Sequence, residues 1–124
     1  MLKKTITYED FNGVKRTEDF FFNLNKAELL ELQFGESGGL SNILERIVAE
    51  NDSQKMMEMF KKVITMSYGQ KSDDGKRFIK NQQVLEYFTS TNAFSDLFME
   101  IATDADKAAE FIKAILPADI SQAS

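Results

Sequence analysis

The sequence contains no cysteine, no histidine and no tryptophan, and it has only one proline among its 124 residues. The lack of cysteine excludes disulfides, zinc–thiolate sites and thiol nucleophiles. The lack of histidine removes the commonest general base and metal ligand. No apolar run approaches the roughly 20 residues that a bilayer span needs. The basic start Met1–Lys4 is followed by polar residues, unlike a signal peptide. We therefore expect a cytoplasmic protein without a membrane span, a metal or a cofactor.

The composition is that of a folded domain, with 43% hydrophobic and 28% charged residues. The length fits one domain of the usual roughly 100–200 residues. We expect a single globular domain over residues 1–117, which contains a hairpin at 3–22 and a helical part at 25–116. Residues 118–124 follow Pro117 and are predicted to form a flexible tail.

Charge is distributed unevenly along the chain. Residues 1–54 carry a net charge of −4, residues 55–80 carry +4 and residues 81–124 carry −5. The basic residues of the middle segment are Lys55, Lys61, Lys62, Lys71, Lys76, Arg77 and Lys80. They form either a solvated helix face with a polar loop or a basic patch for nucleic acid. The alternation of sign favours contact with another protein or a second copy, and we expect no nucleic-acid partner.

The first 22 residues predict a β-hairpin, because Asn12-Gly13 between β-type runs is typical of a two-residue type I′ loop. This loop places Phe11 opposite Val14. It also predicts the pairs Asp10–Lys15, Glu9–Arg16, Tyr8–Thr17 and Ile6–Asp19. One face then carries Phe11, Val14 and Phe20, and the other carries Ile6, Tyr8 and Phe21. Since neither face is polar, both are expected to be partly covered.

Apolar residues at helical spacing predict about six helices after the hairpin. Asn25 and Glu28 form a capping-box pattern for a helix that ends near Gly35. The others are predicted at 40–50, 54–68, 81–90 and 93–102, and from Thr103 as cap to Pro117. Gly69 is predicted as a left-handed helix terminator before a polar loop over 69–80. The fold class is α+β and mostly helical, with Phe60 and Phe111 in the core.

The motifs that resemble catalytic or ligand sites each have a simpler interpretation. Ser72-Asp73-Asp74-Gly75 is part of a calcium-loop pattern, but the twelfth position from Asp73 is Val84 rather than Glu. Gly38-Gly39 can in principle hold a phosphate before a helix, but a simple interhelix loop is the better interpretation of one Gly-Gly pair. Asp104 and Asp106 suit the first turn of a helix. We predict no catalytic, metal or cofactor-binding residues and no enzymatic activity.

Two groups of apolar residues are candidates for contact with another protein. Phe20, Phe21 and Phe22 place large side chains on both faces of one strand. Met56, Met57 and Met59 give a helix flexible side chains that repack easily. The alternative is that most of them lie in the core. A lone two-stranded hairpin has unpaired edges, so a client or a second copy can add a strand there.

Three stretches, taken in order, resemble a known family. They are TITYEDFNGVKRTEDFFFNLNKAELLEL at 5–32, ITMSYGQKSDDGKRFIK at 64–80 and AFSDLFMEIATDADKAAEFI at 93–112. Together they resemble the tail assembly chaperones of long-tailed siphophages that infect Gram-positive hosts. The resemblance implies a late protein of the host cytoplasm that coats the tape measure protein, delivers it to tail tube subunits and is absent from the virion. In that family a ribosomal frameshift often gives a longer second form, and no catalytic residues are defined.

Two other functions remain open at this point. The chain is alternatively a structural tail protein, such as a terminator or connector, and its presence in purified virions would favour this. A small nucleic-acid-binding protein acting through residues 55–80 would show salt-dependent DNA binding. A tape measure gene immediately downstream would favour the chaperone. Partners expected for the chaperone are the tape measure protein, the tail tube protein and further copies of the chain.

Overall fold

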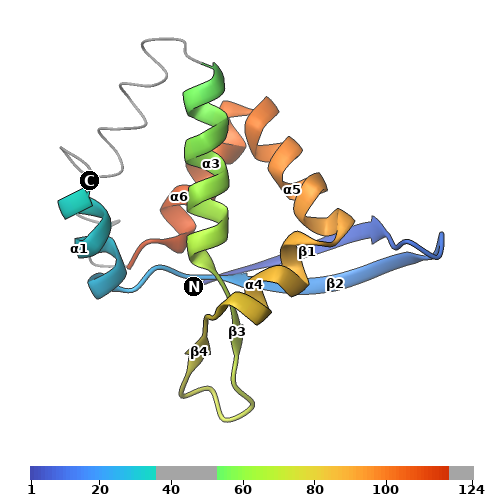
Figure 1. The fold of residues 1–124 in the computed structure, drawn as a ribbon, viewed down its shortest axis with the longest axis horizontal. Coiled ribbons are helices and arrows are strands. Elements are labelled where there is room, and N and C mark those ends of the chain that lie inside the picture. Colours follow the sequence, from blue (N-terminus) through green and yellow to red (C-terminus); the bar gives the residue numbers. More distant parts are fainter. Residues whose placement is uncertain (36–52, 118–124) are drawn as a thin grey trace.

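The computed structural model describes residues 1–35 and 53–117, which form four strands and five helices (Figure 1). In chain order these are β1 (Leu2–Glu9), β2 (Lys15–Phe22), α1 (Lys26–Gly35), α3 (Ser53–Ser67), β3 (Tyr68–Lys71), β4 (Phe78–Ile79), α4 (Gln82–Thr89), α5 (Asn92–Thr103) and α6 (Ala105–Ile115). The mixture of strands and helices is as predicted, but the antiparallel sheet has four strands in the order β1-β2-β3-β4. The predicted helix at 40–50 and the predicted tail at 118–124 lie outside the described residues.

The loop of the first hairpin is one residue longer than predicted. The Gly13 N–H donates to the Asp10 carbonyl at 3.0 Å, and Gly13 has a φ of 79°. This is the pattern of a three-residue loop with a left-handed residue at its end. The Asp10 carboxylate explains the choice, since it accepts from the N–H groups of Asn12 and Val14 at 2.9 and 3.0 Å.

The longer loop shifts the strand register by one residue. Tyr8 lies opposite Arg16 rather than Thr17, and Glu9 lies opposite Lys15. Such a shift changes which side chains share a face. Both predicted face groupings are therefore wrong, namely Phe11 and Val14 with Phe20, and Ile6 and Tyr8 with Phe21. Ile6, Tyr8, Phe20 and Phe22 share the buried face. The outer face is mostly polar and carries Lys3, Thr5, Thr7, Glu9, Lys15, Thr17 and Asp19 beside the half-buried Phe21.

Residues 69–80, predicted as a polar loop, contribute a second hairpin. α3 ends at Ser67 and the chain enters β3 at once, where Tyr68 and Gly69 pair with Phe22 and Phe21. Gly69 is not a left-handed terminator, because its φ is not positive. A Cβ at this position would lie 2.6 Å from the Phe78 ring, so glycine permits the close approach of β4.

Side-chain caps fix where the helices begin. The Glu28 N–H donates to Asn25 Oδ1 at 2.8 Å and the Asn25 N–H donates to Glu28 Oε1 at 3.0 Å, which confirms the capping box. α4 begins after Asn81, whose side chain accepts from the Val84 N–H. α6 is capped by Asp104 rather than by Thr103, since the Asp104 carboxylate accepts from the N–H groups at 106 and 107.

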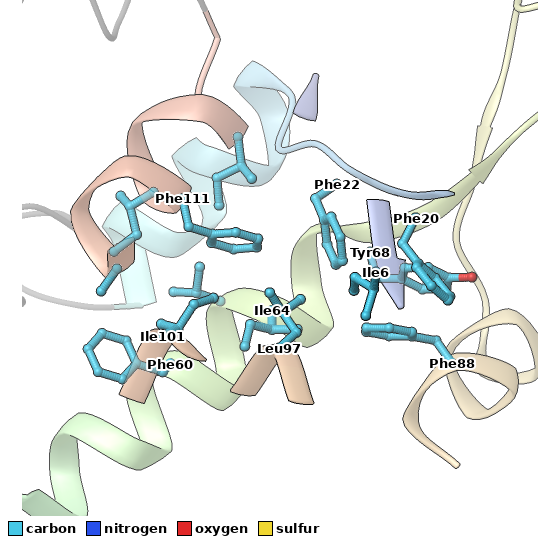
Figure 2. Packing of buried hydrophobic residues seen from close by; sticks show 14 of the residues in the cluster. Ile6, Phe20, Phe22, Phe60, Ile64, Tyr68, Phe88, Leu97, Ile101 and Phe111 are labelled. Atoms are coloured by element: carbon cyan, nitrogen blue, oxygen red, sulfur yellow. The ribbon is translucent and has the colours of Figure 1, made fainter. Parts of the chain in front are cut away.

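The core lies between the inner face of β1 and β2 and the helices α3, α5 and α6 (Figures 1 and 2). Phe60 and Phe111 are both buried, as predicted. Aromatic rings from several elements meet beside β2: the Phe22 ring lies 5.2 Å from that of Phe111, and the Phe20 ring lies 5.2 Å from that of Phe88. The buried rings of Phe20 and Phe22 therefore anchor β2 to the helices and hold the outer face of this strand in place.

Candidate protein-contact surface

The six residues proposed for protein contact divide between core and surface. Phe20, Phe22 and Met59 are buried, with exposed fractions of 5%, 0% and 8%. Met56 is partly buried and packs against the same core. Met57 is 51% exposed on α3, and Phe21 is half-buried on the outer face of β2. In this structure Phe21 and Met57 are therefore the members of the set that face outward.

β2 pairs with β3 over a short length. The paired residues are Phe21 with Gly69 and Phe22 with Tyr68, after which β3 leaves the side of β2 and runs with β4 away from the helices (Figure 1). The two strands therefore diverge, and along residues 15–20 the edge of β2 has no strand beside it in the described part of the chain.

The hydrogen-bond pattern shows which peptide groups point from this edge. The Asp10 N–H donates to the Val14 carbonyl at 2.9 Å, so these residues form a hydrogen-bonded pair. Such pairs recur at every second position of an antiparallel ladder. The peptide groups of Thr17 and Asp19 consequently point away from β1. Further along the chain, Asn23 follows the same alternation. Its N–H also points away from β1 and donates to the carbonyl of Ser67, directly before β3, at 2.8 Å.

A cleft of about 430 Å³ occupies the fork between the two strands. We call it the β2–β3 cleft, and it is lined by Glu18, Asp19, Phe20, Phe21, Tyr68, Gly69, Gln70, Lys71 and Tyr87. Tyr87 projects from α4 and is 62% exposed. Tyr68 is buried, and desolvation raises the pKa of its hydroxyl. The cleft thus joins a free strand edge to tyrosine side chains.

Glu18 connects the third tyrosine of the chain to this cleft. The Tyr8 hydroxyl donates to Glu18 Oε1, and this bond, with burial as a smaller cause, raises the pKa of Tyr8 to about 12. The other Glu18 oxygen lies 3.5 Å from the Arg16 guanidinium. All three tyrosines of the sequence therefore lie in or beside the β2–β3 cleft.

Two other surface features border the hairpin. Phe11 and Val14, 80% and 55% exposed, stand at its tip, which projects beyond the helices (Figure 1). A groove of about 360 Å³ lies beside Leu2 and Lys4, next to α5 and α6. Lys4 donates there to Glu100 at 3.1 Å. The walls of this groove are therefore joined by ion pairs of Glu100 with Lys4 and Lys107.

The basic residues of the segment 55–80 do not gather on one element. Lys61 and Lys62 are exposed on α3, whereas Lys71, Lys76 and Arg77 lie on the β3–β4 hairpin. Lys80 is tied down, since its ammonium group lies 2.6 Å from Glu28 Oε2 and donates to the Asn23 carbonyl at 2.7 Å. The segment therefore contributes to several surfaces.

The motif at 72–75 forms a turn. Asp74 Oδ1 accepts from the Ser72 hydroxyl at 2.6 Å and from the Lys76 N–H at 3.0 Å, which lowers the pKa of Asp74. Within the described residues no group of three or more acidic side chains is placed to hold a metal ion. Gly38-Gly39 lies outside those residues. Within the same ranges, no helix is both long enough and apolar enough to cross a membrane.

Sequence reasoning missed the β2–β3 cleft and the part played by Tyr68 and Tyr87. Helical spacing places Tyr68 at the end of the helix predicted at 54–68, and the polar residues after it show no alternation that would indicate a strand. One signal was available: Phe78-Ile79 after Gly75 is a short β-type pair behind a turn. Taken with Tyr68-Gly69 it indicates a second hairpin.

A comparison with known protein families identifies a family for the chain. A family model described as phage tail assembly chaperone matches residues 1–124, the whole chain. No curated protein and no solved structure matches it. The order of segments that carries the resemblance thus agrees with an independent family model. The chain belongs to the phage tail assembly chaperone family.

Proposed function

We propose that the protein binds the tape measure protein in the cytoplasm of the infected host and recruits tail tube subunits to it. The family supports a role in tail assembly with protein partners. The resemblance described above supports these two partners and the departure of the chaperone before the virion is complete. A client with long apolar surfaces needs a chaperone that offers apolar contact while staying soluble, and a net charge of −5 suits this.

The observation that carries the proposal is the half-buried Phe21 on an otherwise mostly polar outer face, beside the free edge of β2. The exposed part of the Phe21 side chain gives this face an apolar contact point. Next to an unpaired strand, it offers a partner an apolar contact together with backbone hydrogen bonds. We propose Phe21 as the central contact residue and Met57 as a second contact on α3.

Self-association without a client belongs to the same proposal. β1 and β2 each leave one edge without a neighbouring strand in the described part of the chain, apart from the short pairing of β2 with β3. Two different edges on one sheet favour head-to-tail contact between copies. A client that covers one edge would then compete with the next copy.

Co-purification with tagged tape measure and tail tube proteins tests the proposal. We expect Phe21→Lys to fold and to recover at least about tenfold less partner, because a charge replaces the apolar contact. Phe11→Lys is the matched control: the same substitution at an exposed aromatic of the hairpin tip should leave recovery unchanged. Equal recovery by wild type and Phe21→Lys would show that this surface is not the contact. Recovery of the chain from purified virions would contradict its departure.

A further inference from the structure

We infer that the β2–β3 cleft takes an extended client segment as an added strand, with an arginine or lysine side chain between Tyr87 and Glu18. The inference rests on the proposed function and deepens it, because it names the edge, the shape of the ligand and its chemistry. It differs from contact at Phe21 alone, since the main binding groups are the peptide groups of β2 and the tyrosines within the fork.

The shape of the ligand follows from the backbone. Thr17 and Asp19 present peptide groups on the side of β2 that faces the fork, and the described part of the chain supplies no backbone partner for them. Only an extended chain can satisfy a row of alternate N–H and C=O groups. Because β3 diverges from β2, the fork offers room for one such segment.

The chemistry of the ligand follows from the inner wall. Tyr87 is 62% exposed beside Tyr68 and Gln70. The Glu18 carboxylate on the facing strand accepts from the Tyr8 hydroxyl and lies 3.5 Å from the Arg16 guanidinium, and a carboxylate has acceptor capacity for a further donor. The Lys71 ammonium is turned to the Ser72 carbonyl at 3.4 Å. A cation on a long apolar stem can lie against the tyrosine ring and reach the carboxylate, which neither an acidic nor a short apolar side chain can do.

The outer side of the cleft, at Phe21 and Asp19, determines which ligand residues fit on either side of the cation. Successive side chains of an added strand point to opposite faces, so the residues flanking the cation lie beside Phe21 and Asp19. β-Branched residues suit these positions, because their side chains pack well on the pleated surface of a strand. The preferred segment thus alternates a basic or apolar residue toward the tyrosines with threonine or valine toward Phe21.

Tyrosine fluorescence reports on this cleft, because the sequence has no tryptophan and its three tyrosines all lie in or beside the site. The probe is a short synthetic peptide with threonine at every second position. The positions between the threonines carry valine, then arginine, then valine. We expect a saturable change in the fluorescence of the full chain. The same peptide with glutamate in place of arginine should bind at least about fivefold more weakly.

Two proline variants give a matched test of the edge. Thr7 and Thr17 lie opposite each other, their hydroxyls are 2.9 Å apart, and their N–H groups point to opposite edges of the hairpin. Thr17→Pro removes a donor inside the cleft and should weaken the peptide at least about tenfold. Thr7→Pro removes the equivalent donor at the far edge and should keep affinity within about twofold of wild type.

If Thr17→Pro does not fold, Tyr87→Ala replaces it, because that side chain is largely exposed. This variant should weaken the arginine peptide and leave Tyr8 and Tyr68 as reporters. Failure of the arginine peptide to bind wild type, or equal binding to Thr17→Pro, would overturn the inference. Release of self-associated chains by the arginine peptide would support the inference, because a client that covers this edge competes with the next copy. Co-purification with tail proteins tests the proposed function, and peptide binding tests this inference. The two can therefore fail independently.

Discussion

Phe20, Phe21 and Phe22 show at the scale of single residues how one strand serves two purposes. Alternation along β2 sends Phe20 and Phe22 into the core and leaves Phe21 on the outer face. The inward pair meets rings from Tyr68, Phe88 and Phe111. Identical side chains at neighbouring positions are therefore expected to respond differently to the same substitution.

Truncation of these phenylalanines should separate stability from binding. Phe22→Ala removes a fully buried ring and should lower the free energy of unfolding by about 3–5 kcal/mol. Phe21→Ala should lower it by about 1 kcal/mol or less, because the ring is half-buried and leaves no enclosed cavity. Urea unfolding of the two variants measures the difference. Equal losses would mean that the outer face is as tightly packed as the inner face.

The turn carboxylate Asp10 should make the hairpin tip sensitive to acid. Its bonds to Arg16 and to two backbone N–H groups lower the pKa of Asp10 below its ordinary value of 3.8. A lowered pKa means that the group stabilises the fold above pH 3.8, and this contribution is lost as the pH falls through the folded-state pKa. The protection of the Asn12 and Val14 amides against hydrogen exchange, taken relative to the intrinsic exchange rate at each pH, should therefore fall in acid. Asp10→Asn keeps an acceptor but should remove this pH dependence.

At the scale of elements, the second hairpin decides whether the sheet has a fork. β3 follows α3 without a loop, and this direct entry fixes Tyr68 against Phe22, with their ring centroids 5.7 Å apart. Lys80, at the end of β4, is anchored to Glu28 of α1. The hairpin is thus held at its base, while its turn extends away from the helices (Figure 1).

Gly69→Ala should loosen this second hairpin. The added Cβ would meet the Phe78 ring at 2.6 Å and the Ile79 carbonyl at 3.0 Å, so β4 has to move. We expect a loss of about 1–3 kcal/mol in unfolding free energy, typical of overpacking. Gln70→Ala, an exposed position on the same strand, is the control and should change stability little. If Gly69→Ala melts at the same temperature as wild type and Gln70→Ala, Gly69 is not closely packed against β4.

At the scale of the whole molecule, the two open edges of the sheet predict a concentration-dependent assembly. Light scattering of the purified chain should show a mass above that of a monomer, which dissociates on dilution. Phe21→Lys should shift this equilibrium toward the monomer, because it places a charge beside one edge. A monomer at every concentration, for wild type and variant alike, would show that a client is needed before either edge is used.

Local patterns in the sequence determined most elements and the broad class of the fold. Asn25 with Glu28 predicted the start of α1, and the apolar stripes around Phe60 and Phe111 predicted the helices α3 and α6 with their buried faces. These features depend on residues within one or two turns of each other, so the printed sequence contains the necessary information. The order of segments likewise indicated the family that the whole-chain match supports.

Tertiary structure alone decided the second hairpin and the cleft, whereas the register depends on a local contact that the Asn12-Gly13 pattern did not reveal. Asp10 selected a three-residue loop because its carboxylate can cap two N–H groups, and that single residue changed which side chains share a face. Tyr68 and Gly69 became a strand because Phe21 and Phe22, nearly fifty positions away, offered an edge to pair with. Strand pairing depends on such distant partners, whereas helices depend on near neighbours, so the sequence predicted the helices better than the sheet.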